Sequence, residues 1–258
     1  MKQSMQAMVI LGGCALISCA AALAQESEPT ISTAYVSINC DRGVSDADGK
    51  KVADFLDQQD TTLRRLLGVQ DTAKIAVRVY DSIGKFLGEA GLKTPWRMAI
   101  FTRGVIFVQP VRALVQRRKF DKALSYEFAR AYLVPVGQKG CPPWLIEAFA
   151  SYHSGEVEDL TPPVGAQLSA FSDLAQNLQD YTEPPQRDDV HFILSHTMAY
   201  LVGKYGEAKA FGLFKAFDGT TPVEGVFKKV LGDDYSTVEK GWAKYIAYQT
   251  RPFKTKSN

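Results

Sequence analysis

The sequence predicts an α+β protein, with a small mixed sheet and its helices over residues 25–110 and a mainly helical half over residues 111–250. Runs of alternating apolar residues, which are typical of strands, occur only before Pro110. Helical periodicity dominates after that proline. The chain has 258 residues, of which 46% are hydrophobic and 22% charged, so it can bury a full core.

The N-terminal half alternates strands and helices. Ser45 and Asp46 offer an N-cap for an amphipathic helix that ends at Gly68. Two apolar runs separated only by Arg103 and Gly104 predict a β-hairpin. The expected elements are a strand over 33–39, a helix over 47–67, a strand over 74–80, a short helix over 82–88 and hairpin strands over 98–102 and 105–109.

The C-terminal half is expected to be helical throughout. Pro135 would stop its first helix, and Pro142 and Pro143 would pre-set the first turn of the next. The expected helices cover residues 114–133, 144–153, 164–178, 190–205, 208–217, 223–231 and 236–248. Residues 251–258 are expected to form a loose basic tail.

Residues 1–24 have the composition of a signal peptide. Lys2 precedes an apolar stretch, and Ala22 and Ala24 supply the small residues that a signal peptidase requires. We therefore expect export, to the periplasm or as a secreted protein. Two alternatives stay open: an uncleaved segment that anchors the chain in a membrane, or a lipoprotein signal with Cys19 acylated. A membrane partner is expected only in these two cases.

Removal of residues 1–24 would leave two cysteines, Cys40 and Cys141. An even pair in an exported chain predicts one disulfide, because the exported compartment is oxidising. The alternative is two separate buried thiols.

The charge balance and the histidine count limit the classes of ligand. Lys and Arg total 30 against 28 Asp and Glu, a net charge of +2, so no nucleic-acid partner is expected. The chain has three histidines, so a histidine-rich zinc or haem site is not expected either. We expect each of His153, His191 and His196 to be a surface or core residue rather than a metal ligand.

Two predicted helices carry strings that resemble a known family. Residues 124–130 read LSYEFAR, and residues 142–152 read PPWLIEAFASY. Together they resemble the peptidase MA-like family, which consists of gluzincin-type zinc metallopeptidases, and the resemblance extends over about residues 33–250. In that family the first helix bears H-E-x-x-H, with two zinc-binding histidines and a general-base glutamate. The second helix, P-x-W-L-x-E-G-x-A-x-Y, supplies a carboxylate ligand.

The resemblance places the two zinc histidines of the family at Tyr126 and Arg130, the general base at Glu127 and the third ligand at Glu147. Positions i and i+4 share one face of a helix, so this spacing would bring two imidazoles to one ion. A guanidinium has no lone pair and is permanently charged, so Arg130 cannot replace an imidazole. We therefore expect no metal and no other cofactor, although the family uses zinc.

The charge and shape of an arginine side chain at position 130 suit a place beside two carboxylates. Loss of a dication would leave Glu127 and Glu147 facing each other, and a guanidinium supplies both a positive charge and a planar fork of donors. We expect Arg130 to pair with Glu147 first and with Glu127 second. The Tyr126 hydroxyl would donate a further hydrogen bond.

Three functions follow as hypotheses. The first is an exported, zinc-free, catalytically inactive relative of the metallopeptidases that keeps the fold as a binding or structural module, with a peptide or an envelope protein as candidate partner. The second is an active hydrolase that uses Glu127 with an unconventional metal or none. The third is an envelope scaffold or interaction protein in which the former site plays no part.

Overall fold

The computed structural model describes residues 30–68, 74–155, 158, 160–165, 168, 170–180 and 186–251. The predicted signal peptide over residues 1–24 and the basic tail beyond Arg251 lie outside these residues. Among the described residues, no helix is both long and apolar enough to cross a membrane.

In the part of the chain that the structure describes, five strands precede the helices of the second half, so the predicted α+β class is confirmed. The strands are β1 (Thr30–Ser32), β2 (Val36–Cys40), β3 (Ile75–Val79), β4 (Ala99–Thr102) and β5 (Val105–Val108). The helices are α1 (Asp46–Leu67), α2 (Ile83–Ala90), α3 (Val111–Gln116), α4 (Phe120–Tyr132), α5 (Val134–Gly137), α6 (Pro143–Ser154), α7 (Phe171–Asp180), α8 (Gln186–Tyr205), α9 (Glu207–Ala216), α10 (Val223–Leu231) and α11 (Tyr235–Gln249).

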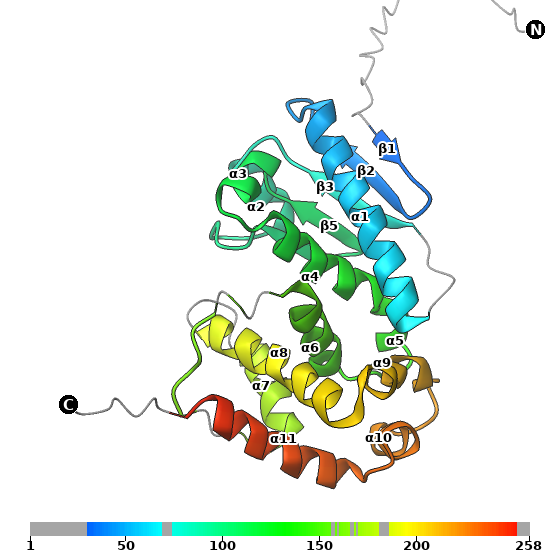
Figure 1. Ribbon diagram of the computed structural model, residues 1–258. Coiled ribbons are helices and arrows are strands. Elements are labelled where there is room, and N and C mark those ends of the chain that lie inside the picture. Colours follow the sequence, from blue (N-terminus) through cyan, green and yellow to red (C-terminus); the bar gives the residue numbers. More distant parts are fainter. Residues whose placement is uncertain are drawn as a thin grey trace, which may run out of the picture.

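The strands form one mixed sheet in the order β1-β2-β3-β5-β4. The central strands β2, β3 and β5 are parallel, and the edge strands β1 and β4 pair antiparallel with their neighbours. Helix α1 crosses one face of this sheet (Figure 1). That face carries Val36 and Val77, whereas α2 packs against the opposite face around Tyr80 and Phe107.

One hydrophobic core joins the sheet to the helices. Its buried side chains run from Val36 in β2 to Ile246 in α11. In the helical half, the rings of Trp144 and Phe171 stack with centroids 4.3 Å apart, and Trp242 packs on the same phenyl ring at 4.6 Å. Aromatic pairs of this kind stabilise a core beyond their buried area. They fix α6, on which part of the candidate site lies.

Helix α1 and the β4–β5 hairpin lie where their capping and turn residues predicted them. The Ser45 side chain accepts a hydrogen bond from the Asp48 amide at 3.1 Å, and Gly68 ends α1 at a φ of 61°. Arg103 and Gly104 adopt φ values of 51° and 79°, as a two-residue hairpin turn of type I′ requires. The sequence rules for caps and turns therefore hold in the half that contains the sheet.

The hairpin fixes the direction of the backbone groups of β4. The Gln109 amide donates to the Met98 carbonyl at 3.0 Å, so Met98 directs its backbone groups toward β5. Because this direction alternates along an antiparallel strand, the backbone groups of Phe101 face away from β5. The free edge of β4 lies beside α4, which packs against it.

The helix predicted over residues 114–133 is two helices, α3 and α4, so this prediction was wrong. Arg118 adopts a left-handed φ of 54°, and the Lys119 amide donates to the Leu114 carbonyl at 2.9 Å. This is the ending that glycine normally provides, and here arginine provides it. The sequence contains no glycine or proline at this point to indicate the break.

Three smaller differences concern short or irregular segments. The prediction missed β1, which has only three residues, and α5, which has four. It also began α7 at Val164, whereas that helix begins at Phe171. Short elements carry too few residues for a periodic pattern.

The predicted disulfide is wrong, because Cys40 and Cys141 are both free and buried. Cys40 ends β2 against α1, where a Cβ placed on Gly49 would lie 3.0 Å from its sulfur. Cys141 precedes α6 and lines a cavity with Arg130 and Glu147. The even cysteine count gave no information on whether the two segments meet. Burial raises the pKa of both thiols, so both are held in the unreactive thiol form.

Candidate functional site

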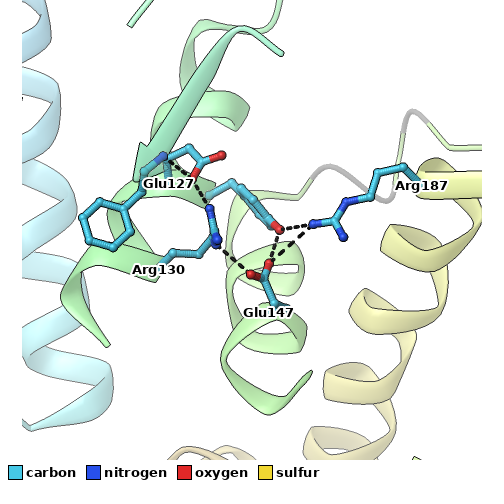
Figure 2. Close-up of polar contacts among 6 residues, drawn as sticks. Glu127, Arg130, Glu147 and Arg187 are labelled. Carbon is cyan, nitrogen blue, oxygen red and sulfur yellow. Dashed lines mark hydrogen bonds and ion pairs between the residues drawn. The ribbon is translucent and has the colours of Figure 1, made fainter. Parts of the chain in front are cut away.

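The helices α4 and α6 pack against each other and bring the motif residues together (Figure 2). Tyr126 and Arg130 are one turn apart on α4 and therefore share the face that meets α6. Glu147 projects from α6 toward both of them. The sequence prediction that these residues converge is confirmed.

Arg130 lies between the two glutamates. Its Nε donates to Glu147 Oε1 at 2.8 Å, and its Nη1 donates to Glu127 Oε2 at 2.6 Å. The side chain of Glu127 is 4% exposed and that of Glu147 is 12% exposed. One guanidinium thus makes charge-assisted hydrogen bonds to two buried carboxylates, as predicted.

The edge strand supplies a further donor that the sequence did not indicate. The Phe101 amide donates to Glu127 Oε2 at 2.8 Å. This is a backbone group of β4 that faces away from β5. The same carboxylate oxygen therefore accepts from both Phe101 and Arg130.

Arg187 is the second cation of the site, and sequence reasoning missed it. It lies in the first turn of α8, its side chain is 6% exposed, and its Nη2 lies 4.0 Å from Glu147 Oε2. The same Nη2 donates to the Tyr126 hydroxyl at 3.5 Å, and that hydroxyl donates to Glu147 Oε2. Two arginines therefore balance two glutamates. The predicted helix began at residue 190, which left Arg187 in a loop and gave no sign of its burial.

The pKa values follow from this arrangement. Burial alone would raise the pKa of Glu147, but Arg130 and Arg187 outweigh it and hold that pKa below its ordinary value. Burial would likewise lower the pKa of Arg130, yet the two glutamates raise it well above the ordinary value. Burial and then the charge of Glu147 raise the pKa of Tyr126 well above 10, so its phenol is neutral.

These residues do not fit zinc. A guanidinium offers no lone pair, a neutral phenol is a poor donor, and both carboxylates are bonded to Arg130. Within the described part of the chain, no group of three or more His, Cys, Asp or Glu side chains could hold a metal ion. The side chains at these positions therefore do not match the zinc site that the resemblance implies.

The ion-pair network separates two cavities. A cavity of about 360 Å³, called the first cavity below, is lined by Tyr126 and Glu127 among others. A second cavity of about 340 Å³ is lined by Arg130 and Glu147. Because Tyr126 is hydrogen-bonded to Glu147 and Glu127 is hydrogen-bonded to Arg130, the network forms the wall between the two cavities.

The three histidines lie apart from one another. His191 borders the first cavity, with its ring centroid 5.0 Å from that of Tyr126. His153 instead hydrogen-bonds to Gln59 of α1 at 2.8 Å, and His196 to the Phe192 carbonyl at 3.0 Å. His191 is therefore the histidine that belongs to the site.

No family model matches this chain, and no curated protein matches it either. Among solved structures, the chain is similar to an M1 zinc metallopeptidase mutant from Deinococcus radiodurans bound to a Tyr-Ser-Ala substrate. The identity is 16% and the TM-score 0.42, over 84% of this chain and 50% of that one. A second structure of the M1 zinc metallopeptidase from Deinococcus radiodurans has 17% identity and a TM-score of 0.40, over 87% and 51%. This chain spans about half the length of these neighbours.

Proposed function

We propose that this chain is an exported, non-catalytic binding protein, in which an internal ion pair has replaced the metal of a gluzincin-like site. The observation that carries the proposal is the position of Arg130, whose guanidinium bonds to both Glu127 and Glu147. By the motif resemblance, this is where metallopeptidases of that type bind zinc. The proposed export rests on the signal-like composition of residues 1–24.

The ion pair stabilises the structure of the site but does not support hydrolysis. Arg130 and Arg187 neutralise Glu127 and Glu147, so the buried carboxylates remain charged without a dication. A guanidinium gives the site no Lewis acid and no bound water of lowered pKa. The network therefore keeps α4, α6 and α8 together and leaves the cavities beside it available for binding.

Glu127 is also badly placed to act as a general base in this arrangement. Its Oε2 already accepts hydrogen bonds from Arg130 and from the Phe101 amide. A base must take a proton from water within hydrogen-bond reach, which leaves that role to Oε1 alone. The hydrolase hypothesis therefore has less support than the hypothesis of a binding protein.

Zinc content and peptidase activity of the purified protein test this proposal. We expect no stoichiometric zinc and no hydrolysis of peptides. Tyr126→His with Arg130→His should gain zinc binding, because two imidazoles and Glu147 would then share one face. Adding Arg187→Gln should tighten that binding, since Arg187 lies 4.0 Å from the carboxylate ligand.

A matched control separates this gain from general affinity of histidine pairs for zinc. Lys50→His with Asp54→His places two histidines at the same spacing on α1, where both side chains are exposed and Glu147 is absent. We expect this pair to bind zinc much more weakly. Stoichiometric zinc in the wild-type protein, or a chelator-sensitive activity lost in Glu127→Gln, would overturn the proposed function.

A further inference from the structure

The first cavity carries more positive charge than its own acids compensate. Arg97, Arg117 and Lys119 line it together with the acids Glu127 and Asp188. Glu127 is already paired with Arg130 at 2.6 Å. The guanidiniums of Arg97 and Arg117 therefore lie beside one acid of the cavity wall, Asp188, that is not paired with Arg130.

The two arginines of this wall have no carboxylate partner among the described residues. The Arg97 guanidinium lies 4.8 Å over the ring of Trp96. Arg117 Nη1 lies 3.5 Å from the sulfur of Met98, next to Arg97 in the chain. A guanidinium without an acid keeps its fork of donors available to an oxyanion ligand.

The backbone between α3 and α4 positions two of these cations. Arg117 is the C-cap residue of α3, and Lys119 is the N-cap residue of α4, where its positive charge opposes the helix dipole. Arg118 between them has a left-handed φ of 54°. No side chain caps this end of α4. A strained backbone residue next to residues that line a cavity is typical of a binding site.

The rest of the cavity suits an apolar body. Trp96, Met98 and Leu160 supply apolar surface, and Tyr126 and His191 supply two ring systems. A volume of about 360 Å³ is near the lower end of small-molecule sites, so the ligand is small.

We infer that the first cavity binds a small organic monocarboxylate with an apolar or aromatic body, held at its carboxylate by Arg97 and Arg117. A dianion such as a phosphomonoester fits less well, because two guanidiniums beside one unneutralised acid, Asp188, leave a single positive charge to balance the ligand. The inference rests on the proposed function, since it treats this cavity as the binding site of a non-catalytic protein.

The test is calorimetric titration of the full chain with 3-phenylpropionate, its neutral analogue 3-phenylpropan-1-ol, and the dianion phenyl phosphate. We expect the acid to bind at least about tenfold more tightly than the alcohol, because charge-assisted hydrogen bonds discriminate by this amount or more. N-acetylphenylalanine and its amide form a second pair. Binding of this acid and not its amide would show that a peptide C-terminus is also accepted, whereas failure of this pair alone would restrict the ligand to acids without an amide group next to the carboxylate.

Variants locate the site. Arg97→Gln and Arg117→Gln should each weaken binding of 3-phenylpropionate about tenfold, whereas Arg112→Gln, an exposed arginine of α3 outside this cavity, should not. The ligand should change the fluorescence of Trp96, since Trp144 and Trp242 are buried elsewhere in the core. In Trp96→Phe that change should disappear while the heat of binding remains.

Equal binding of acid and alcohol, no binding of either, or tighter binding of phenyl phosphate would overturn the inference. Binding unaffected by both Arg97→Gln and Arg117→Gln would overturn it too. None of these outcomes changes zinc content or peptidase activity. The proposed function can therefore stand while this inference fails.

Discussion

Replacing Arg130 with methionine removes the cation that lies between two buried carboxylates. Its nitrogens lie 2.6 Å from Glu127 Oε2 and 2.8 Å from Glu147 Oε1, and these side chains are 4% and 12% exposed. Breaking a buried ion pair by removing one partner costs about 3–5 kcal/mol. We expect Arg130→Met to lower the free energy of unfolding by that amount at neutral pH.

The two carboxylates should not contribute equally to this loss. Glu147 keeps the Tyr126 hydroxyl and Arg187, whereas Glu127 keeps the Phe101 amide and no described cation. Adding Glu127→Gln to Arg130→Met should therefore recover more stability than adding Glu147→Gln, by at least about 1 kcal/mol. This order follows from the position of Arg187.

Urea unfolding between pH 7 and pH 4 measures these effects and their sign. In the wild-type protein the lowered pKa of Glu147 contributes stability above its unfolded pKa, and this contribution is lost as the pH falls. In Arg130→Met the pKa of Glu147 should rise, since burial remains and one cation is gone. The variant then gains stability relative to the wild type as its carboxyl group is protonated, so the deficit should narrow toward pH 4.

The control is Arg112→Met, which removes an exposed arginine of α3 and should change stability by less than about 0.5 kcal/mol. A loss below about 1 kcal/mol in Arg130→Met, or a deficit that does not vary with pH, would refute the role given to this ion pair.

Three further predictions concern residues outside the ion pair. Burial lowers the pKa of His153 to about 4. As the pH falls from 6.5 to 4, His153 is therefore protonated in the unfolded chain but stays neutral in the folded chain. The wild type should lose up to about 3 kcal/mol over that window, and His153→Gln, which cannot be protonated, should lose correspondingly less in urea unfolding. Cys40 and Cys141 should react with a thiol reagent only after unfolding, and a reductant should leave the unfolding midpoint unchanged; fast reaction of the folded protein would contradict their burial. Gly104→Ala should lower the free energy of unfolding by about 1–2 kcal/mol, because alanine disfavours the φ of 79° and no atom lies within 4 Å of the added Cβ. An unchanged melting temperature would argue against the type I′ turn.

Sequence reasoning succeeded where a local rule or a fixed spacing determines the structure. The caps of α1 and the turn at Arg103 and Gly104 follow from side-chain chemistry within a few residues. The contact between Arg130 and Glu147 could be predicted because positions i and i+4 share a helix face and the second motif identified the facing helix.

The features that were missed depend on distant parts of the chain or on strain. Arg187 enters the site from α8, 40 positions beyond Glu147, and nothing in its neighbourhood marks it as buried. The Phe101 amide is a backbone donor, so its residue type carries no signal. Arg118 adopts a conformation that its residue type disfavours. The disulfide prediction failed because composition and compartment do not determine whether two segments meet.

A crystal structure of the wild-type protein grown with excess zinc, with anomalous data collected at the zinc edge, tests the central claim most directly. We expect Arg130 to lie between Glu127 and Glu147, with no anomalous peak within bonding distance of either carboxylate. A zinc peak on Glu147, with the Arg130 guanidinium displaced from the two glutamates, would contradict the claim that an internal ion pair has replaced the metal.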